Sequence, residues 1–157
     1  MGQRLYDTDF YAWTQQQAEA IREAVFSDDR LDRDYLAEEI ESLGISQRTT
    51  CESYLRRIME HLLKVEFVPW PQDVRGWRKE IRAFRANLDA SLSPTLRKQL
   101  SSAEVLDAAY EKARRGLIAD LAEDDVAVAL PGTRPYSWQQ ITTEHPAWFP
   151  EPRYAAQ

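Results

Sequence analysis

The sequence is poor in the residues that hold metals and disulfides: among 157 residues there is one cysteine, Cys51, and there are two histidines, His61 and His145. A single cysteine excludes an intramolecular disulfide and a cysteine-based zinc site, and two histidines leave little for a histidine-rich one. No apolar run approaches the roughly 20 residues that a membrane helix needs, and no charged-then-apolar signal peptide begins the chain. We therefore expect a cytoplasmic protein, with no membrane contact, no metal and no other cofactor.

Familiar catalytic patterns are also missing from the sequence. It has no glycine-rich phosphate loop, no nucleophile elbow and no His-Glu-x-x-His pattern. The Glu-x-x-His pairs of di-iron bundles are absent as well, because Ile58 and Thr142 stand three residues before the two histidines. Cys51 repeats with apolar residues at helical spacing, which is typical of a core position and not of a nucleophile. These absences favour a non-enzymatic protein.

Charge is distributed unevenly along the chain. The net charge is −6, but residues 1–45 carry four basic and eleven acidic groups, whereas residues 73–100 carry seven basic and three acidic ones. Such opposed blocks indicate either two partner surfaces or helices that attract each other within the fold. The overall acidity argues against a general nucleic-acid binder, which needs positive charge to neutralise phosphates.

Apolar residues recur at helical spacing through most of the chain, and no segment alternates as a strand does. The sequence predicts an all-α, single-domain bundle of four to five main helices over residues 1–125, with a Pro/Trp-rich segment, residues 126–157, that wraps over it. We expect helices from Asp7 or Thr8 to about Phe26, Leu36–Gly44, Ser46 to about Phe67 and Val74 to about Leu92. A short helix is expected from Ser93-Pro94, and a longer one from the capping box Ser101-Ser102-Ala103-Glu104 to about Ala122, with a continuous run of the two as the alternative. A last short helix is expected from Ser137.

Each helix has a stripe that we expect to face the core. The stripes are Phe10, Trp13, Gln17, Ile21 and Ala24; Leu36, Ile40 and Leu43; Cys51, Leu55, Ile58, Leu62 and Val65; Trp77, Ile81, Phe84 and Leu88; and Leu106, Ala109, Tyr110, Ala113, Leu117 and Leu121. Within or beside them, we interpret Gln17, Glu39 and Trp77 as a structural polar hub, since a buried amide needs hydrogen-bond partners at both ends.

The stretch Leu36–Gly44 is predicted to be a short acidic helix. Asp32 is placed to cap its first turn, Leu31 to pack on Leu36, and Gly44 to supply a left-handed stop. Its acidic residues, Glu38, Glu39 and Glu41, lie on or near the face opposite the apolar stripe. A solvated or ion-paired face is the more ordinary interpretation of such carboxylates than a metal site.

A stripe of arginines runs along the predicted helix from Val74. Arg75, Arg78, Arg82 and Arg85 share one face, displaced from the apolar stripe of the same helix. Three sources of anions compete for them: the acidic helix of the same chain, a partner protein and the phosphates of a nucleic acid. We favour the acidic helix, because its carboxylates need cations and a bundle would bring the two together.

Four motifs in order resemble one family. They are the stretch from Leu5 to Thr14 with Gln17-Ala18, then Leu36–Gly44, then His61-Leu62-Leu63-Lys64, and then Trp77-Arg78 with Ile81. Together they resemble Domain of Unknown Function 29, a family of small bacterial proteins, over about residues 5–149. The resemblance implies an all-helical, bundle-like fold and no established activity. Departures from the family pattern stand at Val65, Gly76, Arg134 and Trp138.

Three functions are compatible with these observations. The first is a non-enzymatic module that binds a protein partner or forms a homodimer. The second is a metal-dependent hydrolase-type enzyme that uses Glu38, Glu41 and His61, with Lys64 and Arg78 or Arg82 to neutralise a substrate anion. The third is nucleic-acid binding through Arg75, Arg78, Arg82 and Arg85. The lack of a catalytic set favours the first.

Overall fold

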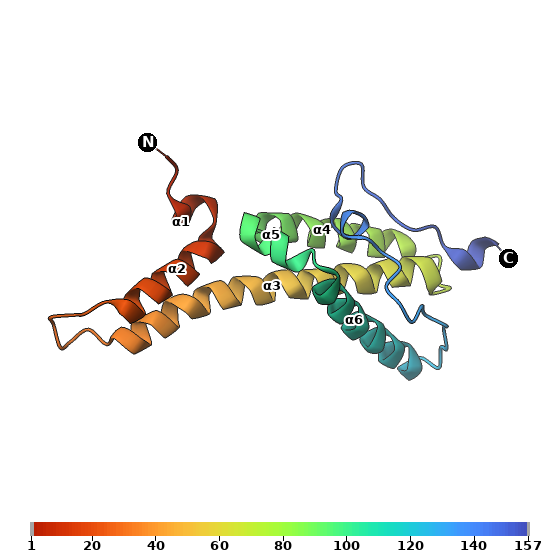
Figure 1. Ribbon diagram of the computed structural model, residues 1–157. Coiled ribbons are helices and arrows are strands. Elements are labelled where there is room, and N and C mark those ends of the chain that lie inside the picture. Colours follow the sequence, from red (N-terminus) through yellow and green to blue (C-terminus); the bar gives the residue numbers. More distant parts are fainter. Residues whose placement is uncertain (1, 157) are drawn as a thin grey trace. The chain divides into compact units, whose positions relative to one another are not determined.

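The computed structural model describes residues 2–156, and every regular element within them is a helix (Figure 1). The helices are α1 (Leu5–Thr8), α2 (Phe10–Glu23), α3 (Arg33–Phe67), α4 (Val74–Ser91), α5 (Pro94–Leu100), α6 (Ala103–Glu123), α7 (Trp138–Thr142) and a final 3-10 turn, η1 (Arg153–Ala156). The predicted all-α class is confirmed.

The chain divides into two compact units, and the boundary between them falls inside α3. Unit 1 consists of Met1–Cys51 and Ser91–Gln99, and unit 2 of Glu52–Ala90 and Leu100–Gln157. Residues 126–157, predicted as a wrapping segment, belong to unit 2 together with α4 and α6. Each unit is described separately below.

Gly44 does not end a helix. The prediction of two helices, Leu36–Gly44 and Ser46–Phe67, is wrong, because α3 runs without a break from Arg33 to Phe67 and no described glycine has a positive φ. The reason for glycine at this position is steric. A Cβ atom at Gly44 would stand 2.1 Å from Oγ1 of Thr14, so the residue allows α2 to approach α3 closely. The predicted cap at Asp32 is confirmed, since its carboxylate accepts a hydrogen bond from the Tyr35 N–H at 3.2 Å.

Asp9 interrupts the first predicted helix, which forms α1 and α2 instead of one helix from Asp7 or Thr8 to Phe26. Its carboxylate accepts hydrogen bonds from the Ala12 N–H at 3.0 Å and from the Thr95 N–H at 2.8 Å. One side chain therefore caps α2 and also satisfies a free N–H in the first turn of α5. Burial alone would raise the pKa of Asp9, but the hydrogen bonds from Thr95 and Ala12 outweigh it and the net pKa is lowered.

The core of unit 2 matches the predicted stripes of the second part of α3 and of α6. Leu55, Ile58, Leu62 and Val65 are fully buried, and each of the six stripe residues of α6 is also buried. On α4, Ile81 and Leu88 are buried, whereas Trp77 and Phe84 are half-buried. The repeated small residues Ala109 and Ala113 let neighbouring elements approach α6 closely.

The segment after α6 is held to unit 2 by specific polar contacts. The Tyr110 hydroxyl donates to the Pro131 carbonyl at 2.6 Å, and the Tyr136 hydroxyl donates to Oε2 of Glu66 at 2.7 Å. The short helix α7 begins with the predicted capping box of Ser137 and Gln140 and places Ile141 in the core. The C-terminal segment is thus part of the packed unit.

Candidate interaction surface

Apart from Tyr11, the side chains that the helical hairpin of unit 1 buries are small. Helix α2 lies beside the first part of α3 (Figure 1), and its buried residues are Tyr11, Thr14 and Ala18. The facing part of α3 buries Ala37 and Gly44. At the edge of the contact, Nη2 of Arg22 and Oε2 of Glu41 form an ion pair of 2.5 Å. Small residues at the contact allow a short distance between the helix axes.

The larger apolar residues of the hairpin lie outside that contact. All members of the predicted α2 stripe, namely Phe10, Trp13, Gln17, Ile21 and Ala24, are only half-buried. On α3, Leu36 and Leu43 are 39% and 53% exposed, and Ile40 is half-buried. The prediction that these stripes face the core is wrong for unit 1. The spacing located the bulky apolar residues correctly, but the chain uses the neighbouring faces with smaller residues for its own packing.

Both stripes lie on the same side of the hairpin. At about 100° per residue, each stripe is displaced by about a quarter of a turn from the buried face of its own helix, in the same rotational sense. Because the two helices run antiparallel, displacements of equal sense bring both stripes to one side. We call this surface the hairpin face. It consists of Phe10, Trp13, Ile21, Ala24, Leu36, Ile40 and Leu43.

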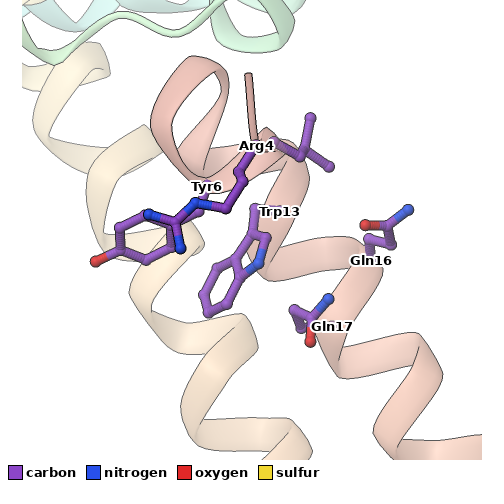
Figure 2. A pocket seen from close by; sticks show the side chains of 6 residues that line it. Arg4, Tyr6, Trp13, Gln16 and Gln17 are labelled. Atoms are coloured by element: carbon purple, nitrogen blue, oxygen red, sulfur yellow. The ribbon is translucent and has the colours of Figure 1, made fainter. Parts of the chain in front are cut away.

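An aromatic cluster borders the hairpin face near α1. The ring of Tyr6 meets Phe10 and Trp13 edge-on, with centroids 5.3 and 4.8 Å away, and Phe10 stacks on Trp13 at 5.8 Å. Beside the cluster is a hollow of about 550 Å³, lined by Arg4, Leu5, Tyr6, Trp13, Gln16 and Gln17 (Figure 2). Gln17, predicted as a polar hub, lines this hollow and makes no side-chain hydrogen bond with residues 2–156.

Exposed apolar side chains are concentrated in unit 1. The described part of the chain exposes nine large apolar residues, and eight of them belong to this unit: Leu5, Tyr6, Val25, Leu31, Tyr35, Leu36, Leu43 and Ile45. The ninth, Ile118, is in unit 2. A second hollow, of about 460 Å³, lies at the turn between α2 and α3, where Val25 and Leu31 are surrounded by acidic residues. Clustered exposed apolar groups are typical of an interaction surface.

The residues proposed for metal-dependent hydrolysis are divided between the units. Glu38 is exposed and Glu41 pairs with Arg22 in unit 1. In unit 2, Nε2 of His61 pairs with Oε2 of Glu80 at 2.7 Å, and Nζ of Lys64 pairs with Oε1 of Glu60 at 3.2 Å. Among residues 2–156, no three histidine, cysteine or acidic side chains are grouped as metal ligands would be.

The arginine stripe of α4 meets an aromatic ring and backbone carbonyls. Arg85 is 1% exposed; its Nε donates to the Ile141 carbonyl at 2.9 Å and its Nη2 to the Gln140 carbonyl at 2.7 Å. Burial lowers the pKa of Arg85 to about 10, with the field of Glu144 opposing and that of Arg82 reinforcing the shift. The group therefore stays charged at neutral pH.

The favoured pairing of these arginines with the acidic helix would join the two units, and it stays a prediction. Within unit 1, Arg22 of α2 is the partner of Glu41. Among the described residues of unit 2, no carboxylate lies at ion-pair distance from Arg78, Arg82 or Arg85. Arg75 and Glu39 are exposed. Trp77, the remaining member of the predicted hub, is half-buried with its ring 6.4 Å from that of Trp70.

Fold and surface together define an all-helical protein with a bulky apolar face on one hairpin. In residues 2–156 no helix is both long enough and apolar enough to cross a membrane. The chain belongs to the family described as domain of unknown function DUF29, whose model matches residues 5–147. This confirms the resemblance found in the sequence.

A solved structure has a similar fold. It is that of an alpha-helical protein of unknown function from Rhodospirillum rubrum, with a TM-score of 0.75 and 25% sequence identity over 91% of this chain and 92% of that one. A comparison with proteins of curated function found no match. The family and the fold are thus shown.

Proposed function

We propose that the protein is a non-enzymatic, self-associating interaction module in which the hairpin face binds the same face of a second copy. The supporting observation is that the bulky apolar side chains of α2 and of the first part of α3 are left outside the buried contact of their own unit. Two hairpins that meet through such faces form a four-helix bundle, the arrangement in which paired helices bury their apolar stripes.

The energetic reason is the apolar area that pairing removes from water. Full burial of a Leu, Ile or Phe side chain is worth about 1.5–3 kcal/mol. The hairpin face presents six large apolar residues, Phe10, Trp13, Ile21, Leu36, Ile40 and Leu43, and each gains in proportion to the area that it still exposes. A two-fold dimer uses each of them twice. That gain must exceed the cost of lost translational and rotational freedom, which is about 4–15 kcal/mol.

The net charge of unit 1 predicts how the strength of this self-association changes with salt. Unit 1 contains seven basic and eleven acidic residues, so two copies of it repel each other. Screening by salt weakens that repulsion. We expect self-association to tighten as salt is added, whereas a complex with a basic partner would loosen. We also propose a cytoplasmic location, in which the buried thiol of Cys51 stays reduced.

Sedimentation equilibrium of the purified chain tests the proposal. The wild type should approach twice its monomer mass of 18.3 kDa as concentration rises. Leu43→Lys places a charge in the centre of the hairpin face and should give a monomer. Ile118→Lys is the matched control, because it adds the same charge at an exposed apolar position of unit 2, and it should behave as the wild type. A monomeric wild type at every concentration, or equal effects of the two substitutions, would contradict the proposal.

A further inference from the structure

Three arginines of unit 2 converge on one aromatic ring. Arg78, Arg82 and Arg85 follow each other at helical spacing on α4, and their Cζ atoms lie 5.5, 5.1 and 5.2 Å from the centroid of the Phe149 ring. A cation over an aromatic ring is attracted by the ring quadrupole, but the ring carries no net charge. Phe149 therefore holds three positive groups together without neutralising them.

The positive charge of this cluster is incompletely balanced. No carboxylate of residues 2–156 forms an ion pair with the three arginines, although the field of Glu144 reaches Arg85. Counting Glu144, the cluster has a charge of about +2. In addition, Nε of Arg78 and Nη1 of Arg85 are buried without a hydrogen-bond acceptor. Buried donors normally have partners, so this shortage of acceptors needs a cause.

A small hollow adjoins the cluster at Arg82. Its volume is about 190 Å³, and it is lined by Arg82, Glu144, His145 and Ala147. Since one water occupies roughly 30 Å³, the hollow has room for a tetrahedral oxyanion. Arg82 is exposed, whereas Arg85 is buried, so Arg82 is the arginine that a ligand from solvent meets first.

We propose that unit 2 binds a phosphate group in this hollow, with Arg82 contacting the phosphate oxygens and Arg78 and Arg85 supplying the positive field. A dianionic phosphate matches the charge of the cluster, and the guanidinium fork of Arg82 suits two of its oxygens. Phe149 keeps the arginines in place before the ligand arrives. Inorganic phosphate and a phosphate monoester share this chemistry. The carboxylate of Glu144, which also lines the hollow, repels the phosphate and so lowers its affinity.

Isothermal titration calorimetry with inorganic phosphate, at an ionic strength held constant with chloride, tests the site. We expect saturable binding to the wild-type chain that Arg82→Gln weakens by about 10-fold or more. Glu144→Gln removes the negative charge beside the hollow and should tighten the binding of phosphate. Arg75→Gln is the matched control, because Arg75 is exposed on the same helix, outside the ring contact and the hollow, and it should bind as the wild type.

The three variants make the outcome decisive. Binding that is absent, or that Arg75→Gln and Arg82→Gln weaken equally, would overturn the proposal, since general attraction by the basic stripe would then suffice. Weaker binding by Glu144→Gln would overturn it as well. Methyl phosphate, titrated in parallel, distinguishes the sources: tighter binding than that of inorganic phosphate assigns the site to a monoester, and weaker binding assigns it to the free ion.

Discussion

The two units use apolar stripes in different ways. In unit 2, the chain after α6 returns to the helices and contributes Tyr136 and Ile141 to the core, where they are 2% and 0% exposed. In unit 1, the largest stripe residues of the α2–α3 hairpin remain partly open to solvent, and small residues form the contact. The comparison shows that helical spacing identifies an apolar stripe but does not identify which element covers it.

The units also differ in how they use polar groups. In unit 2, Glu66 is buried and accepts hydrogen bonds from the Tyr136 hydroxyl and from Nε of Arg153, each at 2.7 Å. Burial and the hydrogen bond to Glu66 raise the pKa of Tyr136. The carboxylate of the Arg22–Glu41 pair of unit 1 is more exposed, with 32% of the Glu41 side chain accessible against 8% for Glu66. Because exposed pairs contribute little, unit 1 depends more on close helix packing and capping.

Replacing the same residue type in each unit should give the largest contrast. Tyr136→Ala removes a buried ring and its hydrogen bond to Glu66, and we expect a loss of about 3–5 kcal/mol in the free energy of unfolding. Tyr35→Ala, at a position that is 68% exposed in unit 1, should change it by about 0.5 kcal/mol or less. Urea denaturation followed by circular dichroism measures both.

This contrast depends on unit 1 being monomeric, so the two variants are compared at a concentration below that of self-association. A large loss from Tyr35→Ala under those conditions would mean that the exposed ring contributes to the folded monomer. A small loss from Tyr136→Ala would mean that the C-terminal segment is not required by the core of unit 2. Either result would remove the difference between the units.

Alanine substitution of one helical glycine in each unit tests whether the two units also differ in how closely their helices pack. Gly44→Ala brings a Cβ atom against Thr14, and we expect a loss of about 1–3 kcal/mol because the close contact of α2 with α3 must open. Gly116→Ala in α6 meets nothing within 4 Å and should stabilise unit 2 by about 0.5–1 kcal/mol through helix propensity alone. Thermal unfolding should show a lower melting temperature for Gly44→Ala and a higher one for Gly116→Ala than for the wild type.

A second substitution, Thr14→Ala, tests why Gly44→Ala lowers the stability of the chain. Thr14→Ala removes the Oγ1 atom that lies closest to the new methyl group, so the double variant should recover part of the stability. No recovery would mean that the remaining side-chain neighbours, Nε2 of Gln15 and Cβ of Thr14 at 3.2 Å each, resist the substitution, and not the Thr14 hydroxyl.

Much of the fold follows from local sequence signals. The stripe of α6, the cap at Asp32 and the Ser137–Gln140 capping box are interactions between residues close in the chain, and the sequence predicts each of them. The same holds for the end of α3 at Phe67, two residues before Pro69.

Contacts between distant residues were the part that the sequence could not supply. Gly44 has the pattern of a helix stop, and its role beside Thr14 depends on how two helices pack. Arg85 belongs to a stripe that resembles a solvent-facing one, yet carbonyl groups of Gln140 and Ile141, more than 50 residues away, allow its burial. The candidate surface was predicted as core for the same reason, because the spacing within one helix contains no information about its neighbours.

The capping residues of the two units should differ in how their contribution to stability depends on pH. The pKa of Asp9 is lower in the folded chain than its ordinary value, near 3.9, so the charged carboxylate stabilises unit 1 above that pH and loses this contribution as the pH falls through the folded pKa. Asp9→Ala should therefore cost about 1–2 kcal/mol at pH 7 and progressively less below about pH 4. Ser102→Ala removes the neutral cap of α6, whose hydroxyl oxygen accepts from the Val105 N–H at 3.4 Å, and its cost of about 1 kcal/mol should be the same at every pH. Urea denaturation between pH 2.5 and about pH 7 measures both differences. A pH-independent cost for Asp9→Ala would show that the cap acts through its geometry and not through its charge.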